Sequence, residues 1–328
     1  MKRLILIFFL AALLLGCTPE QAPSPEETAA PTAIPETTTV PETTISIAAE
    51  LPLAAEAPTP SPGIILQPEA PGEAETRCSE AVIDYSHCEE GYIMAQYFGE
   101  TDKRLKILVK GPTTTYSYNL PLGEWTVFPL SDGNGIYQVG LYRNTTGTKY
   151  AKLMVAEFEV ALQDEFAPFL RPNQYVNYVD APDTMEMGET LCAGLEHPLD
   201  KVAAVYDFVV DHLSYDHEKA AQVQSGYLPV LDQVLSEGKG ICFDYAALMA
   251  AMLRSQQVPC KLVVGYAGSV YHAWISVWTE ENGWIDGVVF FDGHSWKRMD
   301  PTFASSGNRS QDIMDFIEHG TYTAKYLY

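Results

Sequence analysis

Residues 238–254, GKGICFDYAALMAAMLR, carry the strongest indication of the fold in this sequence. After two glycines the stretch runs through Ala, Leu and Met, which favour an α-helix, so we predict a helix over residues 242–256. Its one cysteine, Cys242, stands where this helix begins. The first turn of a helix carries unpaired N–H groups and the positive end of the helix dipole, both of which stabilise a thiolate. Position alone leaves an inert core residue as the alternative, because free cysteines are often buried and unreactive.

The hydrophobic residues follow a helical period before this stretch and a strand pattern after it. PLDKVAAVYDFVVDHLSYD, which begins at Pro198, spaces its apolar residues as a helix does. After residue 256, the segments CKLVVGYAG, HAWISVW, residues 288–291 and SWKRMDPTF indicate strands. Helices followed by an antiparallel sheet form an α+β order. We therefore predict an α+β domain over residues 198–328, with a helix packed on an antiparallel sheet.

From about residue 90 to residue 162, within a domain that we expect over residues 77–165, the sequence shows the two-residue alternation of β-strands. In KRLKILVK, the apolar Leu105, Ile107 and Val109 alternate with polar positions, and TYSYNL, IYQVGLY and AEFEVAL alternate in the same way. Short alternating strands broken by Gly, Pro and Asn indicate a small all-β sandwich, of which the immunoglobulin-like fold is one form. We interpret it as a spacer, with presentation of a substrate as the alternative. Residues 166–197 are expected to be a connecting segment.

The first 17 residues, MKRLILIFFLAALLLGC, have the form of an export signal. Lys2 and Arg3 precede an apolar run that is too short for an ordinary membrane span. The ending LLGC resembles a bacterial lipobox, which implies that Cys17 is lipidated and anchors the chain to the membrane at the bacterial cell surface. A plain secretory signal and an N-terminal anchor are the alternatives, and both also export the chain.

Residues 18–76 contain twelve of the chain's 22 prolines and ten glutamates but no Lys or Arg. Such a composition cannot bury enough apolar surface to offset the entropy lost on ordering, so we expect a disordered tether. It would lift the folded part off the membrane. An unselected spacer predicts the same structure.

Acidic residues dominate the charge of the chain. There are 43 Asp and Glu against 20 Lys and Arg, a formal net charge of −23, of which about −15 belongs to residues 77–328. Nucleic acids bind basic patches, so this charge argues against a nucleic-acid partner. It slightly favours basic or neutral substrates.

The six cysteines bear on redox chemistry and on metal binding. An exported chain can form disulfides, and Cys78 and Cys88 are the pair that we expect because they are close in sequence. No CxxC or HExxH spacing is present. We therefore expect neither a metal nor another cofactor.

A cysteine nucleophile needs a base, and the base needs an acceptor that orients it. His272 lies 30 residues after Cys242 and opens HAWISVW, and Asp300 precedes a proline in SWKRMDPTF. Singly, such a His is more often a packed side chain and such an Asp-Pro a strand-ending turn. Their order and contexts together point to a catalytic triad.

GKGICFDYAALMAAMLRSQQVPCKLVVGY, HAWISVW and WKRMDPTF resemble the motifs of the transglutaminase-like superfamily of papain-type cysteine enzymes. The likeness covers residues 198–305 and implies a papain-like core with Cys242 as nucleophile, His272 as general base and acid, and Asp300 as the orienting residue. The gap from His272 to Asp300 is 28 residues, about twice that of many members, and Asp286 lies nearer the usual distance. The Pro-Thr that follows Asp300 favours it over Asp286, and GWIDGVVFFDG then looks like an inserted hairpin.

The resemblance implies acyl transfer at an amide of a protein or peptide, for instance one associated with the cell wall. Attack by the thiolate would form a thioester, which water resolves in a protease or amidase and an amine resolves in a crosslinking enzyme. We slightly favour hydrolysis because water is abundant at an exposed surface site. A non-catalytic binding module and an adhesin are the alternatives. The presence of all three triad residues favours the enzyme.

Overall fold

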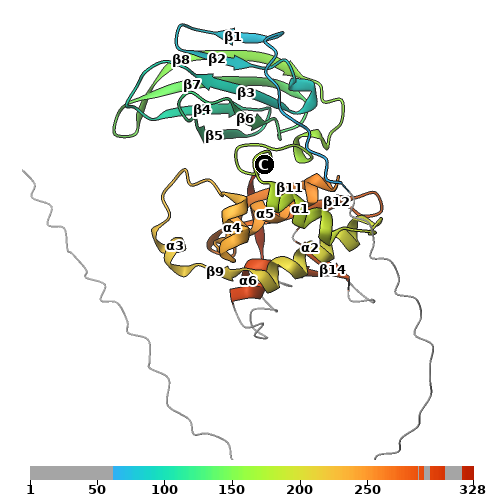
Figure 1. Ribbon diagram of the computed structural model, residues 1–328. Coiled ribbons are helices and arrows are strands. Elements are labelled where there is room, and N and C mark those ends of the chain that lie inside the picture. Colours follow the sequence, from blue (N-terminus) through green and yellow to red (C-terminus); the bar gives the residue numbers. More distant parts are fainter. Residues whose placement is uncertain (1–61, 287, 292–295, 307–319) are drawn as a thin grey trace, which may run out of the picture. The chain divides into compact units, whose positions relative to one another are not determined.

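The computed structural model describes residues 62–286, 288–291, 296–306 and 320–328 (Figure 1). The predicted signal with Cys17, and residues 18–61 of the predicted tether, lie outside these ranges. Within them, no helix has the length and apolar character needed to cross a membrane. Strands fill the first part of the described chain, and the second part contains both helices and strands (Figure 1).

The first part consists of two four-stranded antiparallel sheets, ordered β1-β2-β3-β6 and β5-β4-β7-β8 (Figure 1). Both contribute buried residues to one hydrophobic cluster, and the rings of Tyr118 and Phe128, one from each sheet, lie 5.0 Å apart. The strands are β1 (Glu75–Arg77), β2 (Ala81–Asp84), β3 (Tyr92–Tyr97), β4 (Leu105–Lys110), β5 (Thr115–Asn119), β6 (Thr126–Pro129), β7 (Gly135–Thr146) and β8 (Lys149–Val160).

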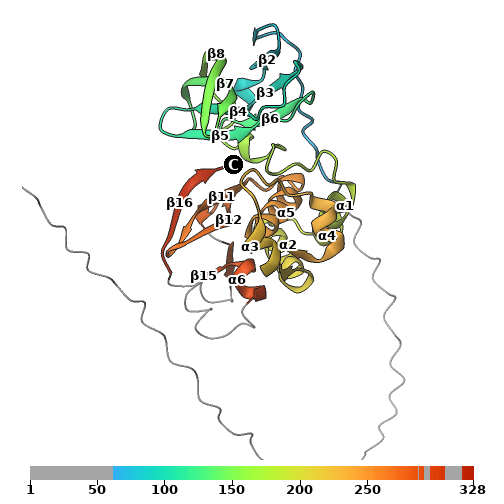
Figure 2. The same cartoon turned by 90° about the vertical axis from the view of Figure 1, so that its left-hand side faces the viewer.

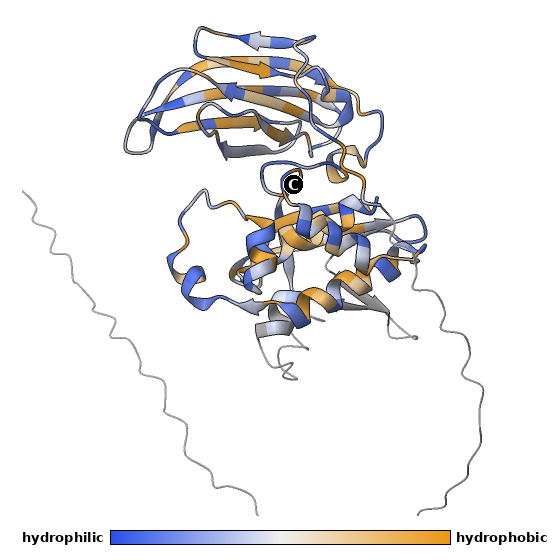
Figure 3. Ribbon diagram, viewed as in Figure 1, coloured by the Kyte–Doolittle hydropathy of each residue, from blue (hydrophilic) through white to orange (hydrophobic). Residues whose placement is uncertain are grey.

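Alternate residues of these strands face the core, as the sequence predicted. Leu105, Ile107 and Val109 of β4 are each at most 2% exposed. Figure 3 shows apolar and polar positions alternating along the strands. The predicted antiparallel β-sheets are confirmed, and the immunoglobulin-like arrangement stays a prediction.

The disulfide predicted between Cys78 and Cys88 is not formed, because both residues are free thiols. Cys78 lies just before β2, whereas Cys88 begins the short 3-10 helix η1 (Cys88–Glu90) beyond the other end of that strand. A strand rises about 3.3 Å per residue, so β2 holds the two apart by roughly 10 Å, more than the ~7 Å that a disulfide spans. The sulfur of Cys88 lies instead 4.0 Å from the carbonyl oxygen of Glu159.

The second part packs helices on an antiparallel sheet ordered β13-β12-β11-β16 (Figure 2). Helix α5 (Cys242–Ser255) contacts both β11 (Cys260–Ala267) and β12 (Val270–Thr279), and it is buried from its third residue to its end. The predicted helix on an antiparallel sheet is therefore confirmed. The other elements are η2 (Ala167–Phe169), α1 (Pro182–Leu191), α2 (Pro198–His212), β9 (Ser214–Tyr215), α3 (His217–Gln222), α4 (Leu231–Glu237), β10 (Lys239–Gly240), β13 (Gly283–Asp286), β14 (Val288–Phe291), β15 (Trp296–Met299), α6 (Pro301–Ser306) and β16 (Tyr322–Leu327).

Two segments differ from the sequence prediction. Residues 166–197, expected to be a connection, contain α1, which packs against α5. The described end of the predicted tether, residues 62–76, is bound to the folded part: Gly63 N donates to Glu189 Oε1 at 2.7 Å, and Ile64 N donates to the carbonyl oxygen of Ser255 at 2.8 Å. An apolar pair, Ile64 and Ile65, interrupts the Pro- and Glu-rich composition there, and Ile65 packs against the core.

The described residues between His272 and Asp300 belong to two antiparallel strand pairs rather than to one inserted hairpin. Strand β12 pairs with β13, and β14 pairs with β15. GWIDGVVFFDG therefore contributes one strand to each pair. The second pair ends at Met299, so Asp300 follows directly from its last strand.

Candidate active site

Cys242 is the first residue of α5 and lines a cleft of about 550 Å³. The helix begins here because Asp244, in its first turn, accepts a hydrogen bond from the N–H of Ile241 at 2.8 Å. That bond satisfies one of the N–H groups that every helix start leaves unpaired. The thiol therefore sits at the helix end that stabilises negative charge, as the sequence predicted.

His272 is carried by β12, opposite Gly265 of β11. A side chain at Gly265 would come within 2.0 Å of the backbone oxygen of Thr323, so glycine lets β16 approach this part of the sheet. The His272 ring is 4% exposed, and its Nε2 lies 2.6 Å from Oδ2 of Asp300. The Cys242 side chain is a further hydrogen-bond partner of the ring, for which Nδ1 remains.

The pKa of His272 is raised to about 10. Burial alone would lower it, but the hydrogen bond and the negative charge of Asp300, with a smaller influence of Cys242, outweigh burial. The imidazolium is therefore the stable form at neutral pH. The buried ring holds a proton beside the sulfur of the partly exposed Cys242.

Asp300 is fixed by contacts other than the histidine. Its Oδ1 accepts a hydrogen bond from the N–H of Thr302 at 3.0 Å, and its Oδ2 accepts one from the hydroxyl of Tyr322 at 3.1 Å. Thr302 belongs to α6, which begins at Pro301 directly after the carboxylate. These contacts orient the carboxylate that orients the imidazole.

The structure thus brings Cys242, His272 and Asp300 together and leaves Asp286 aside. Asp286 is exposed at the end of β13, where its Oδ1 accepts a hydrogen bond from Ser276 Oγ at 2.9 Å. In the described ranges no cluster of three or more His, Cys, Asp or Glu could hold a metal ion.

Apart from the His272 imidazolium, the cleft around Cys242 is lined by uncharged side chains. Among its eighteen described lining residues there is no Asp, Glu, Lys or Arg. Six of them are tyrosines: Tyr175, Tyr215, Tyr227, Tyr271, Tyr326 and Tyr328. Tyr215, which had no chemical role in the sequence prediction, has a pKa raised by burial and, to a smaller degree, by interaction with Cys242. Its phenol therefore stays protonated at neutral pH.

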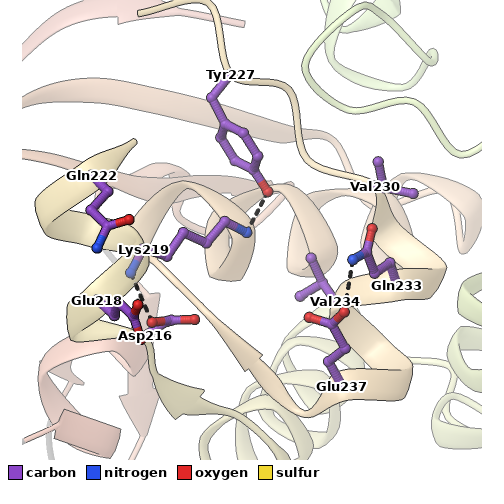
Figure 4. Close-up of a pocket in the computed structure, with 9 residues that line it drawn as sticks. All are labelled: Asp216, Glu218, Lys219, Gln222, Tyr227, Val230, Gln233, Val234 and Glu237. Atoms are coloured by element: carbon purple, nitrogen blue, oxygen red, sulfur yellow. Dashed lines mark hydrogen bonds between the residues drawn. The ribbon is translucent and has the colours of Figure 1, made fainter. Parts of the chain in front are cut away.

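A buried carboxylate anchors one wall of this cleft, residues 220–227, to α5. Asp244 is fully buried and accepts hydrogen bonds from Lys219 Nζ at 2.7 Å and from the hydroxyl of Tyr227 at 2.5 Å. Figure 4 shows Lys219 and Tyr227 meeting in a second hollow, of about 370 Å³, beside α3 and α4. Asp244 thus serves both the helix start and the cleft wall. Lys219 and Tyr227 lie in no motif, so their contacts with Asp244 could not be predicted from the sequence.

Residues 186–287 match the family model described as Transglutaminase-like superfamily. The match contains Cys242 and His272 and ends before Asp300.

Two curated proteins are similar to part of the chain. The uncharacterized protein YebA of Bacillus subtilis is 29% identical over 133 residues, which cover 33% of this chain and 18% of that protein. The protein-glutamine gamma-glutamyltransferase of Pseudomonas aeruginosa is 26% identical over 98 residues, which cover 26% of this chain and 13% of that protein. The chain thus spans less than a fifth of the length of either relative.

A solved structure described as a TGase is also similar in part. It is 23% identical with a TM-score of 0.28, and the superposition covers 40% of this chain and 32% of that one.

Proposed function

Because the chain contains a domain of the transglutaminase-like superfamily, we propose that it is a cysteine enzyme acting on amide bonds of proteins or peptides. The observation that supports this most is the buried contact of 2.6 Å between His272 Nε2 and Asp300 Oδ2, beside a cleft that Cys242 lines. A buried ion pair costs desolvation free energy and is weak support for stability. The location of this ion pair beside a thiol at the start of a helix therefore favours a catalytic role over a stabilising one.

The first half-reaction forms a thioester. The Cys242 thiolate attacks the amide carbonyl carbon, and the carbonyl electron pair moves to oxygen. We assign the backbone N–H of Cys242 and the phenol of Tyr215 as donors to this oxyanion, because the first lies in the first turn of α5 and the second lines the same cleft as Cys242. The His272 imidazolium then gives its Nδ1 proton to the departing amine, and the carbon–nitrogen bond breaks.

The second half-reaction releases the acyl group. Neutral His272 takes a proton from water or from an amine, which attacks the thioester; the carbon–sulfur bond then breaks and restores the Cys242 thiolate. Water yields a carboxylic acid, and an amine yields a new amide. Cys242 is partly exposed, which supports hydrolysis. Transfer to an amine is the second candidate, favoured by the name of the Pseudomonas relative, a glutamyltransferase.

One experiment separates these outcomes. The full chain is incubated with casein and a fluorescent primary amine, with Cys242→Ala as the matched control. Amine incorporation that is lost in the control shows transfer, and new termini or released ammonia without incorporation shows hydrolysis. If neither occurs, and iodoacetamide labels Cys242 no faster in the native chain than in the unfolded one, the enzyme proposal is wrong and a binding module or adhesin is favoured.

We also propose that the chain is a lipoprotein at the bacterial surface. The support is the sequence of residues 1–17, which ends in LLGC. Mass spectrometry of the N-terminal peptide should find a diacylglyceryl group on Cys17, and Cys17→Ala should move the chain from the membrane fraction to the soluble one. An unmodified Cys17 in membrane-bound protein would contradict the proposal.

A further inference from the structure

Exposed hydrophobic side chains gather beside the cleft of Cys242. Among the residues after 165 whose side-chain exposure the structure describes, the exposed large hydrophobic residues lie in residues 216–230 or in the β11–β12 hairpin. They are Val223, Val230, Tyr266, Val270 and Tyr271, with exposed fractions from 37% to 59%. Both segments contribute to the cleft, which Val223 and Tyr271 line directly. Apolar groups that cluster at one place on a surface mark a binding site.

Apart from Cys242 and His272, none of the described residues that line this cleft presents a charged side chain to a ligand. Charged residues make up 19% of the chain, so this lining is unusual for the molecule. The ionised groups close behind the walls are already paired: Asp244 with Lys219 at 2.7 Å, and Asp300 with His272 at 2.6 Å. A charged substrate residue entering the cleft would lose water and gain no partner of opposite charge.

The walls are already in place without a substrate. Lys219 and Tyr227 bind Asp244 on either side of the segment that carries Val223, and Val223 N donates to the carbonyl oxygen of Lys219 at 2.8 Å. The ring of Tyr271 packs edge-on against Tyr266, with centroids 5.5 Å apart. A preformed apolar surface binds an apolar side chain without a large ordering cost.

We propose that this cleft selects substrates with an uncharged aromatic or apolar residue next to the reacting amide, packed between Val223 and Tyr271. The proposal rests on the amide chemistry proposed for Cys242 and adds the class of substrate to it. It excludes acidic peptides and lysine-flanked amides as preferred substrates.

The test uses end-capped peptides, Ac-Gly-Gly-Xaa-Gln-Gly-Gly-amide, with Phe, Leu, Glu or Lys at Xaa. Turnover is measured with the full chain, and binding is measured with Cys242→Ala by a change in intrinsic fluorescence. We expect kcat/KM for the Phe and Leu peptides to exceed that for the Glu and Lys peptides by about ten-fold or more, since burial of such a side chain is worth that much. The same order is expected for binding.

Two matched variants place an ammonium inside and outside the cleft. Val223→Lys should lower the preference for Phe over Glu at least ~5-fold, because the new charge pairs with glutamate. Ile136→Lys, an exposed residue of β7, makes a comparable change of charge elsewhere and should leave the preference unchanged. Tyr271→Ala should raise KM for the Phe peptide more than it lowers kcat.

The outcomes separate the two proposals. Turnover without preference, or with preference for Glu or Lys, overturns the substrate class and leaves the amide chemistry standing. Preferential binding of Phe and Leu without turnover of any peptide supports the apolar cleft and counts against the enzyme. No binding and no turnover overturns both.

Discussion

Replacing Asp300 with Asn tests whether the buried carboxylate keeps His272 protonated. Asn retains Oδ1 as an acceptor for the Thr302 N–H, which lies 3.0 Å from it, but replaces Oδ2 with an NH2 donor. A donor facing Nε2 favours the neutral tautomer that carries its hydrogen on Nδ1. The ring would then present an N–H to Cys242 and could not accept the thiol proton.

The magnitude follows from the pKa of His272. At about 10, this pKa leaves nearly every ring protonated at pH 7. Without the charge of Asp300, burial brings the pKa to or below its ordinary value near 6.5, so at most roughly a quarter of the rings are protonated at that pH. The loss of ring protonation alone therefore lowers the population of the thiolate–imidazolium pair about four-fold or more. The wrong tautomer extends the loss of turnover to roughly 10²–10⁴-fold.

The assay is alkylation of Cys242 by iodoacetamide from pH 6 to pH 9.5, followed by mass spectrometry. The wild-type chain should react much faster than Asp300→Asn at pH 6, and the rates should converge at pH 9.5, where ordinary thiols ionise by themselves. Asp286→Asn is the matched control, because Asp286 binds Ser276 and not the histidine. Equal rates for the wild type and Asp300→Asn across this range would show that Asp300 does not keep His272 protonated.

Three further predictions concern the Lys219–Asp244 ion pair, the imidazole of His272 and the donor to the oxyanion. Lys219→Met leaves the buried Asp244 without its ammonium and should lower the free energy of unfolding in urea by about 3 kcal/mol or more. Lys239→Met, which removes an exposed ion pair, should change it by less than about 1 kcal/mol. Because the pKa of His272 is higher in the folded chain, its proton stabilises the fold fully below pH 6.5 and progressively less up to about pH 10; the stability difference between wild type and His272→Gln should therefore shrink over that window. Tyr215→Phe should lower peptide turnover by about 10²-fold while alkylation of the cysteine changes less than two-fold, and an equal loss in both would count against an oxyanion donor.

Local patterns in the sequence predicted the elements that carry the nucleophile and the base. The helix expected to begin at Cys242 does so, and the strand expected at His272 is the middle of β12. Burial of alternate or helically spaced residues leaves a periodic trace in a sequence, so these elements could be predicted. Asp300 was recognised from the Pro-Thr after it, although an unusual number of residues separates it from His272.

Other parts of the site show no periodic pattern in the sequence. Helices α3 and α4 are six and seven residues long, too short to show a period. Strand β16, which the sequence analysis did not identify, supplies the Tyr322 hydroxyl to Asp300 from 22 residues away. Such contacts join residues that are far apart in the sequence and meet only in the folded chain. They leave no regular spacing in the sequence from which they could be predicted.

Asp244 links the part that was predicted to the part that was not. It lies two residues after Cys242, within the motif, yet its side chain binds Lys219 and Tyr227, which set the cleft wall. One carboxylate therefore fixes both the start of the nucleophile helix and the surface that meets the substrate. Loss of Lys219 should for this reason weaken alkylation of Cys242 and peptide selectivity together, whereas loss of Asp300 should weaken alkylation and leave the preference among bound peptides intact.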